Sequence, residues 1–147
     1  MAAIEKSIFT NMCMIIDGNK VLVQNRIKSW KGYAFPGGHL EPFESITHSV
    51  IREVNEETGL KISNIHFCGI KQWFENDVRN VCFLFKTNTY EGEIKSSDEG
   101  NIFWMNINDL LNSNELAYSF KDMLTIFLEN DKNELYLTCK DYNSILH

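Results

Sequence analysis

The chain has 147 residues, the usual size of one domain built around a single hydrophobic core. Hydrophobic residues make up 44% and charged residues 23%, a globular composition that excludes a disordered or fibrous chain. The 20 acidic residues exceed the 14 lysines and arginines, so the formal net charge is −6. This charge argues against a nucleic-acid duplex or an anionic membrane as the main partner, because both bind to basic surfaces.

Two further features bear on location. Apolar runs such as residues 12–16 are far shorter than the roughly 20 residues of a membrane span, and no signal-peptide pattern opens the chain. The cysteines at 13, 68, 82 and 139 have neither CxxC nor zinc-ligand spacing. We therefore expect reduced, mostly buried thiols in a cytoplasmic protein.

The first half of the chain is predicted to form a β-hairpin, a loop and one helix. Residues 8–16 and 20–26 have the apolar patterns of strands, and residues 17–19 form the tight turn between them. The following loop ends in two glycines, at 37 and 38. Helical periodicity then covers residues 44–58, and Gly59 is expected to end the helix.

The second half is richer in strands. Its predicted elements are strands at 62–70, 78–87 and 102–106, a polar loop at 91–101, a helical turn at 108–111 and a helix at 120–128. This order predicts an α+β fold, in which a mixed β-sheet is flanked by helices. No internal boundary is evident, so we expect one domain over residues 1–147.

The helix predicted at 44–58 concentrates charge on one side. At 100° per residue, Arg52 and three glutamates fall on one arc beside an apolar stripe: Glu53, Glu56 and Glu57. These carboxylates repel one another, and a divalent cation would compensate them. An all-oxygen ligand set suits Mg²⁺ or Mn²⁺. By spacing alone, a solvated acidic helix face is an equally good explanation.

The residues around this helix resemble the signature of the Nudix hydrolase family. The matching pattern is Gly38-x5-Glu44-x7-Arg52-Glu53-Val54-x-Glu56-Glu57-x-Gly59-Leu60. Every specified position of the box, residues 38–60, agrees, and the flanking strand order is also similar. The resemblance implies an α/β/α sandwich and a Mg²⁺-dependent hydrolase of nucleoside diphosphates linked to another moiety.

The resemblance also implies roles for individual residues. The implied metal ligands are the backbone carbonyl of Gly37 or Gly38 and the side chains of Glu53, Glu56 and Glu57. Arg52 is implied to orient the carboxylates, and Glu44 to pair with Arg52. Two residues are candidates for the general base, Glu53 and the loop residue Glu99; a solvated loop carboxylate is the alternative for Glu99.

The substrate is inferred from absent markers. No proline follows Pro42, unlike in ADP-ribose hydrolases, and no tyrosine lies in residues 75–78, unlike in diadenosine polyphosphate hydrolases. The chain therefore resembles the MutT-like branch, which converts nucleoside triphosphates, notably oxidised purine forms such as 8-oxo-dGTP, to the monophosphate and pyrophosphate. The alternatives are hydrolysis of another nucleoside diphosphate derivative, RNA 5′-end pyrophosphohydrolysis and nucleotide binding without catalysis.

A base pocket would need aromatic walls and a few polar groups. Tyr33 and Phe35 are candidate walls, although aromatic side chains more often fill cores. Asn114 is a candidate contact to the base, and Arg26 a candidate contact to phosphate. We expect a monomer or a homodimer.

Overall fold

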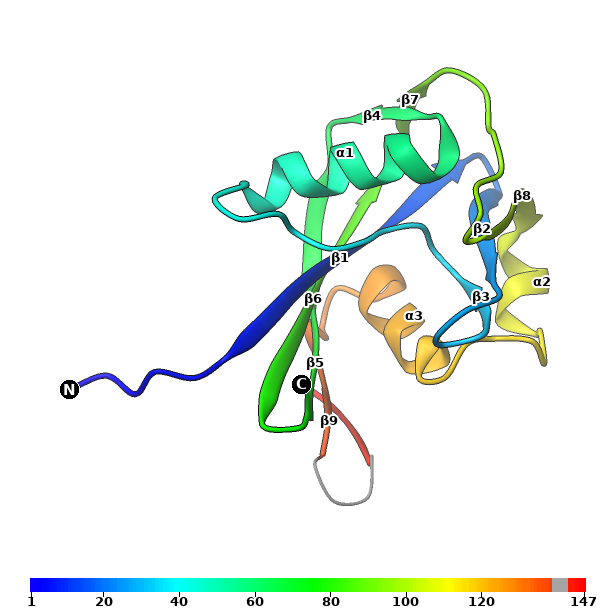
Figure 1. Ribbon diagram of the computed structural model, residues 1–147. Coiled ribbons are helices and arrows are strands. Elements are labelled where there is room, and N and C mark those ends of the chain that lie inside the picture. Colours follow the sequence, from blue (N-terminus) through cyan, green and yellow to red (C-terminus); the bar gives the residue numbers. More distant parts are fainter. Residues whose placement is uncertain (139–142) are drawn as a thin grey trace.

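The computed structural model describes residues 1–138 and 143–147. The strands are β1 (Ser7–Asp17), β2 (Lys20–Arg26), β3 (Gly32–Ala34), β4 (Lys61–Ser63), β5 (His66–Glu75), β6 (Val78–Thr87), β7 (Thr89–Glu91), β8 (Gly100–Asn106), β9 (Glu134–Leu137) and β10 (Ser144–Leu146). The helices are α1 (Ile46–Thr58), α2 (Ile107–Leu111) and α3 (Phe120–Leu128). Helices α1 and α3 lie on opposite faces of a mixed sheet (Figure 1). The predicted α/β/α arrangement is confirmed.

The central sheet runs in the order β10-β9-β5-β6-β1-β2-β3, and β8 pairs with β2. Strand β1 is parallel to β6 over most of its length, from Ser7 opposite Arg79 to Ile15 opposite Thr87. It pairs with β2 only next to their shared turn. The predicted hairpin is therefore correct at its turn but wrong along its arms, since β2 leaves β1 to pair with β3 and β8.

The hydrophobic core has two parts, one on each face of the sheet. In β1, Cys13 and Ile15 pack with Val50 and Val54 of α1, whereas Met14 belongs to the cluster around α3. Because successive side chains of a strand point to opposite faces, a strand buried on both sides is apolar at every position. This explains the uninterrupted apolar run in β1 and fixes α1 above one face.

Three sequence predictions need correction. The strand predicted at 62–70 is two strands, because the backbone turns at Asn64 in the left-handed conformation (φ 49°), which asparagine tolerates. The loop predicted at 91–101 already contains the first residues of β8. Strands β3, β7, β9 and β10 were not predicted, because each is too short for a clear alternating pattern.

Other expectations agree with the structure. Helix α3 has the predicted bounds, and α1 ends at the predicted residue but begins at Ile46, after Ser45, rather than at residue 44. Cys13, Cys68 and Cys82 are free thiols, and Cys139 lies outside the described residues. None of the helices in the described part of the chain is long and apolar enough to cross a membrane.

Candidate active site

Helix α1 holds the acidic residues in a fixed orientation. At its start the Ser45 hydroxyl accepts a hydrogen bond from the His48 amide (3.0 Å), and at its end Gly59 adopts φ +82°. Val50 and Val54 are fully buried against the sheet. Since both ends and the apolar face are fixed, the charged arc turns toward the loop that precedes the helix.

The glycine-containing segment of that loop lies along the edge of β1. The amide of Asn11 donates to the Gly38 carbonyl (2.8 Å), and that of Cys13 donates to the Pro36 carbonyl (2.9 Å). A Cβ on Gly37 would lie 2.0 Å from the Asn11 carbonyl oxygen, so no side chain fits there. The Gly37 amide donates to Glu57 Oε2 (3.0 Å), which joins the loop to the helix.

Arg52 is the central basic group of the site. Its guanidinium binds the Glu44 carboxylate with two nitrogens, at 2.7 and 2.9 Å, as the resemblance implied. It also donates to Glu53 (3.0 Å) and to Glu56 (3.1 Å). The hydrogen bonds from Arg52 lower the pKa of Glu44 to about 2. Arg52 therefore fixes the direction of three carboxylates at once.

Glu57 is placed differently, because the ion pairs of the described residues give it no basic partner. Its residue surface is only 5% exposed. Burial, and next a hydrogen bond shared with Glu99, raise its pKa well above the ordinary value for glutamate. Burial likewise raises the pKa of Glu53. The loop residue Glu99 thus interacts with the carboxylate cluster, although its residue surface is exposed.

The carboxylates are not arranged around an ion as they stand. Among the described residues, no three acidic, histidine or cysteine side chains form a group that could hold one. Glu53 and Glu56 point to Arg52, Glu57 to the Gly37 amide, and the Gly38 carbonyl is bonded to Asn11. The donor chemistry nevertheless fits Mg²⁺ or Mn²⁺, since the oxygens belong to closely placed carboxylates, and Glu57 is buried without a counter-charge.

Gly38 lies directly against the Glu53 carboxylate, and a substitution there tests whether the position of this carboxylate matters. A Cβ there would lie 2.2 Å from Glu53 Oε2, so Gly38→Ala must displace the Glu53 carboxylate. We expect kcat/KM to fall about 10- to 100-fold, because a shift of about 1 Å at a reacting centre has that effect. Gly18→Asn is the control, since a Cβ on this turn glycine meets nothing within 4 Å and asparagine tolerates the left-handed φ of +61° found there. Equal activity of the two variants would contradict the tight packing of Gly38 on Glu53.

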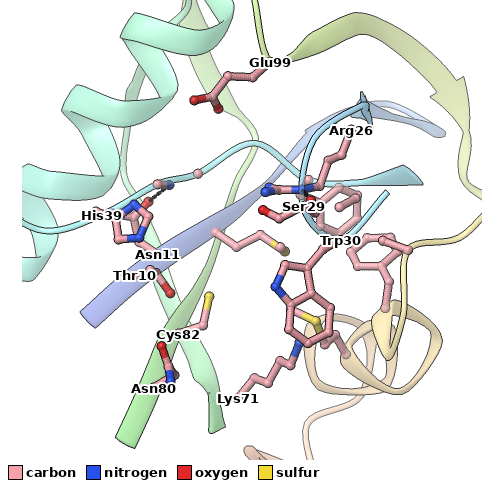
Figure 2. A pocket seen from close by; sticks show the side chains of 18 of the residues that line it. Thr10, Asn11, Arg26, Ser29, Trp30, His39, Lys71, Asn80, Cys82 and Glu99 are labelled. Atoms are coloured by element: carbon pink, nitrogen blue, oxygen red, sulfur yellow. Dashed lines mark hydrogen bonds between the residues drawn. The ribbon is translucent and has the colours of Figure 1, made fainter. Parts of the chain in front are cut away.

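A pocket of about 510 Å³ extends from the carboxylates across the sheet. Glu53, Glu57 and Glu99 lie at one end, and the walls of the other include Trp30, Trp73, Lys71 and Tyr118. Figure 2 shows Glu99 and Lys71 on opposite sides of this space, with Arg26 and Ser29 between them. The volume and the combination of acidic and aromatic walls suit a small ligand with one flat end and one end that binds the carboxylates through a cation.

The pocket corrects part of the predicted base site. Arg26 and Phe35 line it, although Phe35 is fully buried between Phe120 and Phe127 and acts mainly as a core residue. Tyr33 is not among the lining residues, because it packs edge-on against Phe103. Asn114 is exposed in the loop before α3 and is not among them either.

Sequence reasoning missed Lys71 altogether. A lysine beyond the predicted end of a strand looks like a solvated residue, yet this residue is only 5% exposed. Trp30 and Trp73 also line the pocket. Whether Lys71 and Trp73 face the solvent, the core or the pocket depends on how β5 pairs within the sheet, which the sequence does not reveal.

Comparison with known proteins agrees with this geometry. The NUDIX domain model matches residues 9–138. The uncharacterized Nudix hydrolase YvcI of Bacillus subtilis is 33% identical over 109 residues, which cover 70% of this chain and 68% of that protein. The 8-oxo-dGTP diphosphatase of Buchnera aphidicola is 32% identical over 111 residues, covering 69% and 81%. A MutT protein structure from Bacillus halodurans superposes with a TM-score of 0.77 at 27% identity, covering 94% of each chain.

Proposed function

Since the chain belongs to the NUDIX domain family of hydrolases that act on nucleotide derivatives, we propose that it hydrolyses nucleoside triphosphates to monophosphate and pyrophosphate. Oxidised purine nucleotides such as 8-oxo-dGTP are the proposed preferred substrates. The relative named 8-oxo-dGTP diphosphatase, matched over 81% of its length, supports this branch of the family. The absence of a proline after Pro42 supports it over ADP-ribose hydrolysis.

The observation that carries the proposal is the continuous pocket. Its acidic end, with Glu53, Glu57 and Glu99, fits a phosphate chain bound through a cation, and its aromatic end fits a base. One pocket of about 510 Å³ thus offers the phosphates an acidic end and the base an aromatic end. The net charge of −6 counts against a long RNA as the substrate.

Glu53, Glu56 and Glu57 would hold the metal in the proposed mechanism, with a carbonyl of the Gly37–Gly38 turn as a further ligand. When bound, Mg²⁺ would neutralise the charge that develops on the phosphate oxygens during transfer. Arg52 orients the Glu53 and Glu56 carboxylates, and Glu44 fixes Arg52. Arg26 lies between the two ends of the pocket, in reach of a phosphate chain.

A proton must also leave the attacking water. Glu53 and Glu99 are the two candidate acceptors, since both line the pocket and both interact electrostatically within the carboxylate cluster. A comparison of pH–rate profiles of Glu53→Gln and Glu99→Gln assigns the role: loss of the acidic limb in one variant identifies the base.

The function is tested by an activity panel with Mg²⁺. The panel holds normal and oxidised nucleoside triphosphates, ADP-ribose and 5′-triphosphorylated RNA, with phosphate and pyrophosphate products resolved. We expect pyrophosphate from triphosphates, the highest kcat/KM for an oxidised purine and no turnover after chelation of the metal. Faster cleavage of ADP-ribose or RNA than of any free triphosphate would overturn the proposal.

A further inference from the structure

Lys71 is a buried cation at the end of the pocket away from the carboxylates. Its residue surface is 5% exposed, and Figure 2 shows it opposite Glu99. No carboxylate among the described residues forms an ion pair with it, although lysine is almost never buried without a partner. A buried ammonium that the described residues leave without an anionic partner points to an acceptor supplied by a ligand.

A β-bulge turns Lys71 toward the pocket. The pairing of β5 with β6 shifts register between Phe67 and Gly69, so these two residues face opposite sides of the sheet. Beyond the bulge, Lys71 pairs with Cys82 and Trp73 pairs with Asn80, and all four residues line the pocket. The bulge therefore directs a lysine and a tryptophan into the same space.

The surroundings of the ammonium are aromatic. Lys71 Nζ lies 4.3 Å from the ring centroid of Trp30 and 4.6 Å from that of Trp73. Trp30 also stacks on Tyr118, with centroids 5.7 Å apart. The Trp73 indole nitrogen is buried and has no hydrogen-bond partner among the described residues. This end of the pocket thus holds flat rings together with two donors that lack an acceptor.

We propose that Lys71 reads the base of the nucleotide by donating to a ring carbonyl oxygen, so that the site takes 6-oxopurines and 4-oxopyrimidines over their amino counterparts. This inference rests on the proposed function, because the phosphates must occupy the carboxylate end. A lysine ammonium donates hydrogen bonds and accepts none. Guanine presents the O6 and N7 acceptors side by side, whereas adenine places an amino donor at position 6. If an amino group of the base faced Lys71, two hydrogen-bond donors would meet, and neither the ammonium nor the amino group would have an acceptor.

The charge of Lys71 agrees with this preference, which extends to both normal and oxidised guanine. Burial lowers the pKa of Lys71 to about 8, so the group is still largely cationic at neutral pH. Oxidation of a guanine at C8 leaves O6 in place, so Lys71 would bind normal and oxidised guanine alike. The predicted selectivity concerns the oxo group at position 6, and residues other than Lys71 must recognise the oxidised position.

The experiment compares substrates that differ at this position. We expect kcat/KM with Mg²⁺ to be at least about tenfold higher for dITP than for dATP, and for dUTP than for dCTP, the range of one charged hydrogen bond. In Lys71→Met each ratio should fall about tenfold, toward one. Lys71→Gln, whose amide can accept from an amino group, should raise turnover of dATP. Lys121→Met, which removes an exposed lysine of α3, is the matched control and should keep the wild-type ratios.

Binding of monophosphates separates this inference from the proposed function. Tryptophan fluorescence, which reports on Trp30 and Trp73, is titrated with dIMP and with dAMP and needs no turnover. Tighter binding of dIMP that is lost in Lys71→Met supports base reading even if no triphosphate is hydrolysed. Equal affinity for both in the wild type, or an equal loss for every nucleotide in Lys71→Met, overturns it.

Discussion

Glu57→Gln is expected to lower kcat/KM for the preferred triphosphate by about 1000-fold or more, because losing a metal ligand removes several kcal/mol of charge stabilisation. The shape of the site should survive. The glutamine carbonyl can still accept from the Gly37 amide, which donates to Glu57 Oε2 in the wild type. Steady-state kinetics with Mg²⁺, on protein whose circular dichroism matches the wild type, measure the loss.

The same substitution should make the metal-free protein more stable. Because burial raises the pKa of Glu57 in the folded state, the folded protein retains a proton that the unfolded chain releases. This contribution to stability is complete below the unfolded pKa of about 4.3 and is lost as pH rises toward the folded value. A neutral glutamine avoids this loss, so the melting temperature should rise about 2–4 °C per kcal/mol gained, more at pH 8 than at pH 5.

The control for both effects is Glu91→Gln, an exposed carboxylate at the end of β7. It should change neither kcat/KM nor the melting temperature. Mg²⁺ should raise the melting temperature of the wild type and of this control, but not that of Glu57→Gln, since only ligand that binds the native state stabilises it. An active Glu57→Gln enzyme with an intact response to Mg²⁺ would remove Glu57 from the metal site.

The sequence predicted that the acidic side chains of α1 lie close together, because their spacing depends on short-range geometry. Arg52, Glu53, Glu56 and Glu57 lie within two turns of one helix, and helical spacing alone places them on one arc. The pairing of Glu44 with Arg52 required the family resemblance, and the structure confirms it. Helical spacing could not predict that Arg52 donates hydrogen bonds to both Glu53 and Glu56.

The base end of the pocket could not be predicted in the same way, because it depends on long-range pairing. Tyr33 faces Phe103 because β3 and β8 both pair with β2, and neither pairing is visible in the sequence. Lys71 and Trp73 face the pocket because of the β-bulge between Phe67 and Gly69. A one-residue shift moves every later side chain to the other face, and no local pattern records it.

Arg52→Met is expected to affect both stability and activity. The Glu44 side chain is only 8% exposed and is bound by two nitrogens of Arg52, so removing the guanidinium leaves this carboxylate with only the Glu41 amide and His48 as partners. The free energy of unfolding should therefore fall, because Glu44 loses its arginine counter-charge. We also expect kcat/KM to fall about 100-fold, because Glu53 and Glu56 lose the group that orients them. Urea unfolding and steady-state kinetics measure the two effects.

The effect on stability should depend on pH. Hydrogen bonds from Arg52 lower the pKa of Glu44 to about 2 in the folded state. This pairing stabilises the wild type above the unfolded pKa of about 4.3, and the stabilisation is lost as pH falls toward 2. The difference in unfolding free energy between wild type and Arg52→Met should therefore shrink below about pH 4. A difference that does not change with pH would mean that the lost stability does not come from the Arg52–Glu44 pair.

A double-mutant cycle distinguishes the structural role of Arg52 from its role in orienting the carboxylates. In Arg52→Met/Glu44→Gln the carboxylate charge is gone, so more than half of the lost stability should return, which appears as a non-additive cycle. Activity should not return, since Glu53 and Glu56 still lack their basic partner. Recovery of kcat/KM together with stability would show that Arg52 only neutralises Glu44. Unrecovered activity in a restabilised protein would instead make the orientation of the metal-binding carboxylates the function of this arginine.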